Sequence, residues 1–413
     1  METERAILHC DCNCFFASVE LLAYPALRDV PVAVCGSPDE RHGIVLAKNE
    51  AAKRCGVQTA ETIWSAKRKC PTLTLLPPHH EKYTHFSRII NAIYARYTDR
   101  VEPFGIDESW LDITHTWQLF AESPVALANE IRQTVKAETG ISISVGVSFN
   151  KVFAKLGSDY RKPDATTEIS RENYKNIVWP LPVGDLLYVG KAAQGTLAGL
   201  GVKNIGQLAA KDSALLTAAL GKMGAELSRY ARGEDDAPVR TADEKPEVKS
   251  IGNALTFKRN LVSDADLRAG VSALADEVAS RLRRHGLYAS AVQIAMKDVD
   301  LKSIQRQSRL AYPTHLAKEI GDAALVLIAE NWNKNKPMRM LSITAIGLSD
   351  GQEAQQTSLF GAPRTENVKR ENLEKSLDAI RRKYGKLAIA PGNVVQNDLG
   401  LDTIEMDQKI SKK

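Results

Sequence analysis

The stretch Asp11-Cys12-Asn13-Cys14-Phe15-Phe16-Ala17-Ser18-Val19-Glu20 joins an apolar run to a helical pattern near the start of the chain. Residues 5–11 are predicted to form a buried strand that ends in the carboxylate of Asp11. A tight polar turn then leads into a helix predicted over Phe15 to Leu22. The sequence therefore places an acidic side chain at the end of a core strand.

A second acidic stretch lies at residues 100–114, where Asp107 and Glu108 follow Gly105. It is predicted to be a hairpin whose second strand packs through Trp110. Because neighbouring residues of a strand point to opposite faces, both acids reach one point only if the hairpin begins at the glycine. Clustered carboxylates suit a two-metal site, since hard cations such as magnesium prefer oxygen ligands. Acidic residues at loop mouths are usually solvated, so the spacing alone is weak evidence for a metal site.

The remaining pattern divides the chain into an α/β part, a helical part and a second α/β part. Strands and helices alternate up to about residue 150, which indicates a mixed sheet backed by helices. From Thr166 to Gly233 short Ala- and Leu-rich helices predict an all-helical module, and the polar residues 235–249 predict a linker. The order predicted after it, strand-helix-strand-strand-helix-strand, is that of a compact sheet with helices on one face. The tail beyond Asp350 is predicted to contain one helix, around Glu371 to Tyr384.

The length and composition are those of a folded protein with several modules. The chain has 413 residues, 44% of them hydrophobic and 25% charged, which favours about two to four domains. It contains no apolar run of the length that a bilayer requires, and its first residues do not resemble an export signal. We therefore expect a cytoplasmic protein that does not bind membranes.

All six cysteines lie within the first seventy residues, without the regular spacing of a secreted disulfide framework. We expect them to be reduced thiols. The run from His9 to Cys14 also allows a zinc site, because alternate residues of a strand point the same way. No CxxC or HxxxH pair supplies the remaining ligands, so this alternative has less support.

The net charge of +5 is unevenly distributed along the chain. Residues 245–350 contain 16 Lys and Arg against 11 Asp and Glu, whereas the rest of the chain is balanced. A basic excess in one segment fits contact with nucleic acid, and it fits simple surface solubility as well.

Three motifs, in this order, resemble those of the Y-family DNA polymerases and most closely the DNA polymerase IV (DinB) branch. The first is the stretch of residues 11–20, and the second is Gly105-Ile106-Asp107-Glu108-Ser109-Trp110-Leu111-Asp112. The third is Ser148-Phe149-Asn150-Lys151-Val152-Phe153-Ala154-Lys155-Leu156, followed by Ser158-Asp159 and Lys162-Pro163. The resemblance covers about residues 5–360. It implies a template-directed DNA polymerase that extends a primer 3′ end with low fidelity, lacks proofreading and copies damaged DNA.

The resemblance also implies roles for individual residues of the first two motifs. Asp11, Asp107 and Glu108, with the backbone carbonyl of Cys12, would bind two magnesium ions. Phe16 would be the steric gate, an aromatic ring that leaves no room for a 2′-hydroxyl group. The further nucleotide contacts that it implies are Phe15, Lys53 and Lys162.

Two positions depart from the family pattern where it contacts the triphosphate. Glu50 and Lys53 stand where many family members have a tyrosine and an arginine. A carboxylate cannot donate a hydrogen bond to phosphate, and a lysine lacks the bidentate fork of arginine. The usual contact at Glu50 is therefore in doubt. Asn13 replaces a commoner aspartate, but the inferred metal contacts do not depend on it.

The implied fold class is α+β. It is a multi-domain right hand with a ferredoxin-like palm, small fingers, a helical thumb with helix-hairpin-helix elements and an α/β little finger. The implied boundaries are 1–20 and 76–165 for the palm, 21–75 for the fingers, 166–240 for the thumb, 241–248 for a linker, 249–350 for the little finger and 351–413 for a C-terminal tail.

Candidate DNA contacts lie in the helical and the basic segments. Leu186 to Lys191 and Leu200 to Leu208 resemble helix-hairpin-helix elements, whose glycines expose backbone N–H groups to a phosphate. The residues expected to contact DNA there are Gly190, Lys191 and Gly201. In the basic segment they are Lys258, Arg259, Arg281, Arg283, Arg284, Arg306 and Arg309.

The stretch Gln356-Thr357-Ser358-Leu359-Phe360 resembles the sliding-clamp binding motif of bacterial replication proteins. Its apolar pair Leu359 and Phe360, with Gln356 before it, suits capture by a pocket on a partner, although the pair could dock on its own domain instead. The partners implied are primer-template DNA, deoxynucleoside triphosphates and the bacterial sliding clamp, for a monomer that works at the nucleoid. Two rival functions are a catalytically silent DNA-binding adaptor and a nucleotide cyclase built on the same sheet.

Overall fold

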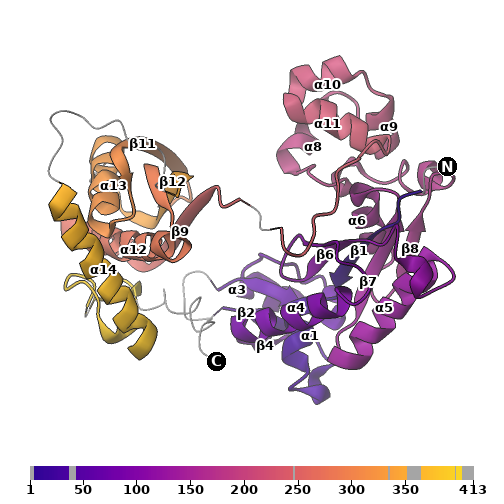
Figure 1. The fold of residues 1–413 in the computed structure, drawn as a ribbon, viewed down its shortest axis with the longest axis horizontal. Coiled ribbons are helices and arrows are strands. Elements are labelled where there is room, and N and C mark those ends of the chain that lie inside the picture. The colour runs from indigo at the N-terminus through magenta and orange to yellow at the C-terminus, as the bar shows by residue number, and fades with distance from the viewer. Residues whose placement is uncertain are drawn as a thin grey trace. The chain divides into compact units, whose positions relative to one another are not determined.

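The computed structural model describes residues 4–36, 43–244, 247–333, 335–350, 364–395 and 397–401. The described residues up to 244 form one compact unit, unit 1, and those from 247 onward form a second, unit 2 (Figure 1). None of the described helices combines the length and the apolar character that a bilayer crossing requires.

Unit 1 is built on a five-stranded sheet in the order β5-β6-β1-β7-β8. All neighbouring strands are antiparallel except β7 and β8. The strands are β1 (Ile7–Cys12), β5 (Val101–Pro103), β6 (Glu108–Asp112), β7 (Ile143–Ser148) and β8 (Thr166–Ile169). The predicted strand before Asp11 and the predicted hairpin at Gly105 are both present.

Helices cover both faces of this sheet. Leu8, Cys10 and Cys12 of β1 pack in a core with α4 (His80–Tyr94) and α5 (Pro124–Thr139). The alternate side chains of β1 point to the opposite face, which α6 covers. The range of α6 is Lys151–Tyr160, and that of α1, which follows β1, is Phe15–Leu21.

Gly146 lets α6 lie against the sheet. A Cβ atom at this position would lie 1.9 Å from the Ala154 carbonyl oxygen and 2.5 Å from the Ser158 backbone nitrogen. Only a glycine allows this approach, because any side chain would overlap the helix backbone. The glycine therefore sets how closely the residues of α6 come to those of β1.

A small three-stranded sheet in the order β3-β2-β4 is also part of unit 1. Its strands are β2 (Val32–Cys35), β3 (Val45–Lys48) and β4 (Thr74–Leu76), and its helices are α2 (Glu50–Arg54) and α3 (Ile63–Lys69). The Asn49 side chain accepts a hydrogen bond from the Ala52 backbone at 3.0 Å and so caps α2.

The helical part of unit 1 begins later than predicted. Thr166–Ile169 is strand β8 and pairs with β7, so the expectation of an all-helical module from Thr166 is wrong for these residues. Pairing between strands of different segments overrides the local helical pattern here. The helices that follow are α7 (Tyr174–Ile177), α8 (Lys191–Gly199), α9 (Ile205–Ala210), α10 (Ser213–Leu220) and α11 (Lys222–Ala231).

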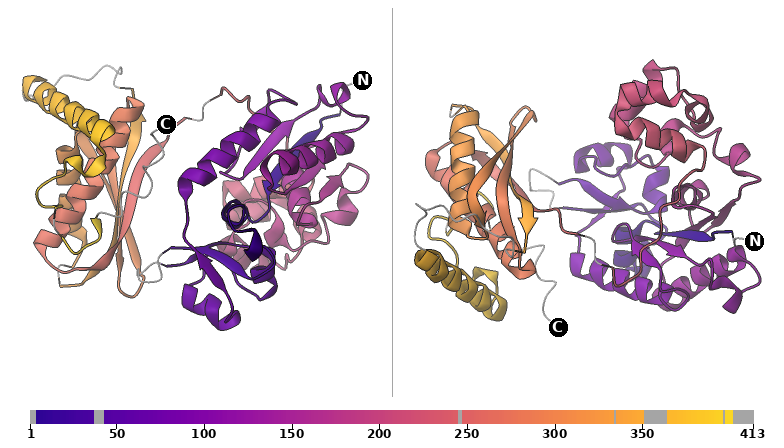
Figure 2. Two further views of the ribbon diagram at one scale, coloured as in Figure 1. Left: turned by 90° about the horizontal axis from the view of Figure 1, so that it is seen from below. Right: turned by 45° about the horizontal axis from the view of Figure 1, so that its top comes forward.

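Unit 2 has the predicted order of elements. They are β9 (Ser250–Leu261), α12 (Asp264–His285), β10 (Tyr288–Asp298), β11 (Ser303–Thr314), α13 (Ala317–Asn331) and β12 (Met338–Ser349). The antiparallel sheet has the order β11-β10-β12-β9, and both helices lie on the same face of it (Figure 2). The helix predicted around Glu371 is α14 (Arg364–Tyr384), which begins earlier than expected. Leu399 and Leu401 are buried in the core of the unit.

Candidate active site

The predicted acidic residues meet where β1 and β6 lie side by side. Asp11 is the register partner of Glu108, so both side chains leave the sheet on the face that α6 covers. Asp107 precedes β6, and its carbonyl oxygen accepts a hydrogen bond from the Cys12 backbone N–H at 3.0 Å. The hairpin at Gly105 therefore gives the two neighbouring acids different directions.

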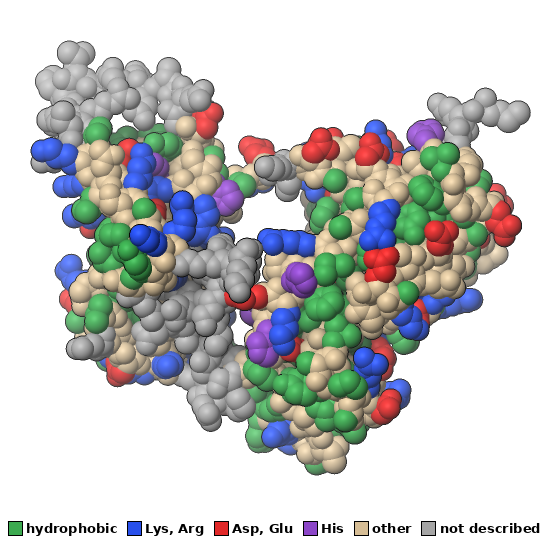
Figure 3. Space-filling model, turned by 60° about the horizontal axis from the view of Figure 1, so that its bottom comes forward, with side chains coloured by type: hydrophobic (Ala, Val, Ile, Leu, Met, Phe, Trp, Pro, Cys, Tyr) green, Lys and Arg blue, Asp and Glu red, His purple; other side chains and the backbone are tan. Residues whose placement is uncertain are grey.

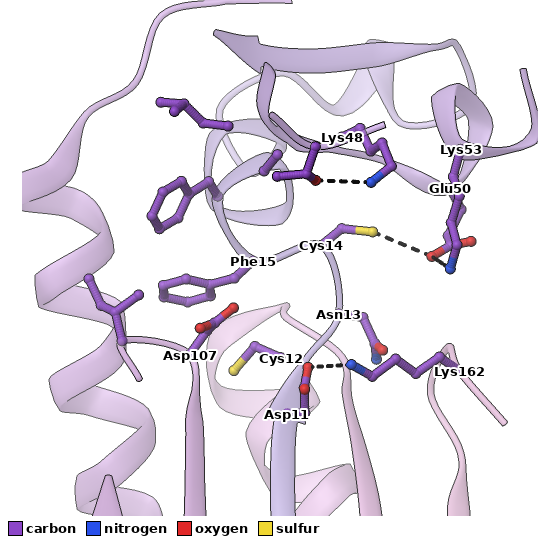
Figure 4. A pocket seen from close by; sticks show the side chains of 15 residues that line it. Asp11, Cys12, Asn13, Cys14, Phe15, Lys48, Glu50, Lys53, Asp107 and Lys162 are labelled. Atoms are coloured by element: carbon purple, nitrogen blue, oxygen red, sulfur yellow. Dashed lines mark hydrogen bonds and ion pairs between the residues drawn. The ribbon is translucent and has the colours of Figure 1, made fainter. Parts of the chain in front are cut away.

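Asp11 and Asp107 line a cavity of about 370 Å³ between the two sheets of unit 1 (Figure 4). The other lining residues are Cys12, Asn13, Cys14, Phe15, Phe16, Leu46, Ala47, Lys48, Glu50, Lys53, Thr59, Ile106 and Lys162. The predicted nucleotide contacts Phe15, Phe16, Lys53 and Lys162 are all among them. Glu108 does not line the cavity, because its side chain turns toward α6.

Lys155, in the middle of α6, and Lys162, just beyond its end, bind these carboxylates. The Lys155 ammonium lies 2.9 Å from Asp11 Oδ2 and 2.7 Å from Glu108 Oε2, and so bridges them. Lys162 Nζ lies 2.8 Å from Asp11 Oδ1. Asp159 contacts both ammonium groups, at 3.2 and 2.8 Å. The sequence reasoning gave no role to Lys155 or Asp159, although their i, i+4 spacing in the third motif signals a shared helix face.

His9 is a further residue that the sequence reasoning left without a role in catalysis. It is fully buried, with Nδ1 2.8 Å from Ser158 Oγ and Nε2 3.3 Å from Glu108 Oε2. Its position two residues before Asp11 on a strand is the signal that could have found it. Burial lowers the pKa of His9, and the hydrogen bond with Glu108 opposes this shift. A neutral His9 supports the Glu108 carboxylate without adding a charge.

The surroundings separate the pKa values of the adjacent acids. Burial, with the nearby charges of Asp11 and Glu108, raises the pKa of Asp107 to about 6. Burial also acts to raise the pKa of Glu108, but hydrogen bonds from His9 and Lys155 outweigh it and lower the pKa to about 2. Glu108 is therefore paired with one cation, the Lys155 ammonium, and also hydrogen-bonded to His9, whereas Asp107 forms no such ion pair among the described residues.

The donor set fits a hard divalent cation. His9, Asp11 and Glu108 each offer one ligand atom, and these atoms lie within 4.8 Å of one another. Carboxylate oxygens from Asp11, Glu108 and the nearby Asp107 are the ligands that magnesium prefers. In the part of the chain that the structure describes, no cysteine belongs to such a cluster, and all six cysteines are free thiols. The zinc alternative has no support here.

Phe16 forms part of a rigid aromatic surface. Its ring stacks on Tyr83, with the centroids 4.0 Å apart and the planes 9° from parallel. The Tyr83 hydroxyl donates to Glu20 Oε1 at 2.7 Å, and this buried carboxylate also contacts Lys82 Nζ at 3.2 Å. These contacts fix the ring of Phe16 at the wall of the cavity.

The opposite wall of the cavity carries the residues that depart from the family pattern. Glu50 Oε1 accepts a hydrogen bond from the Cys14 thiol at 3.4 Å and lies 3.6 Å from Lys53 Nζ (Figure 4). The Lys48 ammonium donates to Thr59 Oγ1 at 3.0 Å. One carboxylate and two lysines therefore line this side of the cavity.

The candidate DNA contacts occupy very different surroundings. On the face drawn in Figure 3, Lys and Arg side chains lie among Asp and Glu side chains, so its described residues show no broad area of one charge. Gly190 is the N-cap residue of α8, and Gly201 has a φ of +75°. Lys191, Lys258, Arg284 and Arg309 are exposed.

The expectation that Arg283 contacts DNA is wrong. Its side chain is 5% exposed, pairs with Glu374 and Asp378 of α14, and donates to the His315 carbonyl. A buried guanidinium with these partners is not available to a phosphate. The sequence could not show this, because the carboxylates lie about ninety residues further along the chain.

Three other candidate arginines already have partners within unit 2. Arg259 forms ion pairs with Asp266 and Asp398. Arg306 is the register partner of the buried Ile294, which places it on the helix side of the sheet, and it donates to Asn331 Oδ1 at 3.0 Å. Arg281 donates to the Gly252 carbonyl oxygen at 2.9 Å. The stretch from Gln356 to Phe360 lies outside the described residues.

Comparisons with known proteins find relatives over most of the chain. The model of the impB/mucB/samB family matches residues 10–159, and that of the family's C-terminal domain matches residues 248–359. DNA polymerase IV of Acetivibrio thermocellus is 45% identical over 97% of this chain and 100% of its own length. DNA polymerase IV 1 of Bacillus subtilis is 37% identical over 95% of this chain and 94% of its own.

A solved structure has the same fold. The Y-family DNA polymerase chimera Dbh-Dpo4(243-245)-Dbh matches with a TM-score of 0.73, over 83% of this chain and 98% of its own, at 22% sequence identity. The predicted α+β, multi-domain architecture is confirmed.

Proposed function

Because the chain belongs to the impB/mucB/samB family of Y-family DNA polymerases, we propose that its cavity is the nucleotide site and that Asp11, Asp107 and Glu108 are its catalytic carboxylates. The protein is a DNA-directed DNA polymerase of the polymerase IV (DinB) type, with low fidelity and a role in translesion synthesis. The observation that carries the site assignment is that Asp11 and Asp107 line a cavity that Phe16 bounds, while Glu108 lies opposite Asp11 in the sheet.

Asp11, Asp107 and Glu108, with the backbone carbonyl of Cys12, would hold two magnesium ions. Bound magnesium would lower the pKa of the primer 3′-hydroxyl and neutralise the leaving pyrophosphate. Lys155 helps to lower the pKa of Glu108 and so keeps this carboxylate ionised. Ser158 holds the His9 ring through Nδ1, and His9 Nε2 in turn contacts and orients the Glu108 carboxylate.

The cavity walls select and orient the nucleotide. Phe16, held flat against Tyr83, would lie under the sugar and exclude a 2′-hydroxyl group. Phe15 is buried beside it and supports the same wall. Lys162 and Lys53 would bind the triphosphate as point charges. Glu50 already neutralises part of the charge of Lys53, so the two do not reproduce a tyrosine and an arginine.

DNA would lie against several surfaces that read no base sequence. The N–H groups near Gly190 and Gly201, with Lys191, suit a phosphate of the duplex. On unit 2, Arg309 pairs in register with Ala291, on the sheet face that the two helices leave uncovered. Lys258 and Arg284 are further exposed cations of this unit.

A sliding clamp is the proposed protein partner. Gln356, Leu359 and Phe360 form the proposed anchor, and we expect a monomer that works in the bacterial cytoplasm at the nucleoid. Deletion of the stretch 356–360 should leave distributive synthesis intact and remove stimulation by the clamp. An equal response to the clamp would refute this assignment.

Primer extension by the purified chain, with magnesium and the four deoxynucleotides, tests the proposed site. A silent DNA-binding adaptor gives no extended product. A nucleotide cyclase turns over free nucleotide without a template. Extension that requires a template and is lost in Asp107→Asn excludes both rivals.

A further inference from the structure

Helix α3 exposes a large aromatic side chain that its own unit does not use. Ile63 and Ala66 pack into the core of the small sheet. Trp64, on the opposite side of the helix, is 69% exposed. Tryptophan side chains are highly buried on average. The Trp64 side chain is mostly exposed, so it contributes little to the core of its unit.

One cationic side chain lies over this indole, and a second is exposed on the same helix. The Arg68 guanidinium lies over the ring, with Cζ 4.8 Å from the centroid. Lys67, three residues after Trp64 on the helix, is also exposed, whereas Lys69 pairs with Glu61 at 2.7 Å. An exposed aromatic face with a guanidinium and an ammonium beside it combines the two groups that bind single-stranded nucleic acid, a stacking surface and phosphate partners.

The position of α3 relative to the cavity can be followed along β3. Lys48, at the end of β3, lines the cavity and donates to Thr59. At the other end, the Gly43 carbonyl accepts a hydrogen bond from the Ile63 N–H, where α3 begins. From Gly43 to Lys48 the extended chain advances by five residue steps, about 16 Å at about 3.3 Å each. This span equals roughly five stacked nucleotides of one strand.

We propose that Trp64 and Arg68 bind an unpaired template base a few nucleotides ahead of the cavity. The inference rests on the proposed polymerase function, because only a template-directed enzyme has a single strand entering its site. Stacking does not depend on base identity, so such a contact suits an enzyme that copies any sequence. A protein partner would be expected to offer carboxylates to Lys67 and Arg68, and the test below separates it from DNA.

The experiment compares full-length variants binding primer-template DNA with template overhangs of about two and about twelve unpaired nucleotides, at one fixed salt concentration. The wild-type chain should bind the long overhang about tenfold more tightly than the short one. Trp64→Ala should lose the tighter binding of the long overhang. Its Kd for the short overhang should equal that of the wild-type chain. Trp64→Phe should keep most of the gain, because a smaller ring still stacks.

Leu119→Ala is the matched control, since Leu119 is 77% exposed but lies outside α3. It should behave as the wild-type chain on both substrates. The inference is overturned if Trp64→Ala weakens the binding of both DNA substrates equally. It is also overturned if the variant binds both substrates as the wild-type chain does, which is the result expected if the site binds a protein. Failure of the wild-type chain to extend a primer would instead overturn the proposed function.

Discussion

Asp11 lies directly opposite Glu108 in the antiparallel ladder between β1 and β6, and a single ammonium group, that of Lys155, bridges the two carboxylates. Their proximity is a consequence of strand register. A shift of one residue would turn one of the side chains to the other face of the sheet.

Removing one carboxylate should abolish primer extension. Asp11→Asn, Asp107→Asn and Glu108→Gln each keep the shape of the side chain but remove an anionic metal ligand. We expect a loss of at least about a hundredfold in the rate of single-nucleotide insertion. Glu138→Gln is the control, because it removes an equal charge from an exposed ion pair with Arg96. Near-normal insertion by Asp107→Asn would exclude Asp107 as a ligand.

The ring of Phe16 should decide which sugar enters. Phe16→Ala opens the wall of the cavity, so ribonucleotide insertion should rise by about a hundredfold or more relative to deoxynucleotide insertion. Tyr83→Phe is the control, since it keeps the stacked ring and loses only the hydroxyl, which donates to Glu20 and accepts from the His79 N–H. An unchanged sugar preference in Phe16→Ala would remove the gate assignment.

Gly146 should tolerate no side chain. In Gly146→Ala the new Cβ would overlap the backbone of α6, so we expect a loss of about 3 kcal/mol in the free energy of unfolding. The helix would also move Lys155 away from the carboxylates, and insertion should slow. Gly195→Ala, on α8, meets no atom within 4 Å and should be neutral or stabilising by about 1 kcal/mol. Thermal unfolding of both variants measures the difference.

Removal of Arg309 should change the salt dependence of DNA binding, whereas removal of Arg283 should lower the stability of unit 2. Arg309→Ala takes a cation from the uncovered sheet face and should lower the slope of log Kd against log salt by about 1. Arg283→Ala should leave that slope unchanged but destabilise unit 2 by about 3–5 kcal/mol, because Glu374 and Asp378 lose a buried partner. A reduced slope in Arg283→Ala would contradict the burial of this side chain.

The stability of unit 2 should depend on pH through His315. Burial and the nearby Arg283 lower the pKa of His315 from 6.5 to about 4. As the pH falls from about 6.5 to about 4, the unfolded chain binds a proton that the folded chain does not, so stability falls, by up to about 3 kcal/mol. His315→Phe cannot titrate and keeps a ring against Tyr288, with which the imidazole stacks at 4.2 Å.

Hydrogen exchange of the β10 and β12 amides at about pH 4.5 and pH 7, corrected for intrinsic rates, measures this dependence. The difference between the two pH values should shrink in His315→Phe and persist in His285→Asn, where an exposed histidine of the same unit is changed. An equal pH response in His315→Phe and the wild-type chain would show that another group titrates.

Much of the fold follows from local sequence signals. The strand that ends near Asp11, the helix from Phe15 and the hairpin at Gly105 are encoded by apolar periodicity and by a turn residue. The bounds of α12 also reflect local signals, because Ser263 caps its start and Gly286 ends it. The motif residues around Asp11 and Asp107 are also contiguous in sequence, so the candidate catalytic residues could be named without coordinates.

The tertiary structure alone decided which charges meet. Lys155 reaches Asp11 across more than a hundred residues, and Arg283 is buried by carboxylates from α14, so neither pairing has a local signature. Strand β8 was missed for the same reason, because its partner is β7 rather than a neighbouring segment. Periodicity and turn chemistry act over a few residues. Ion pairing, burial and strand register depend on which distant segments come together, and only the folded chain specifies that.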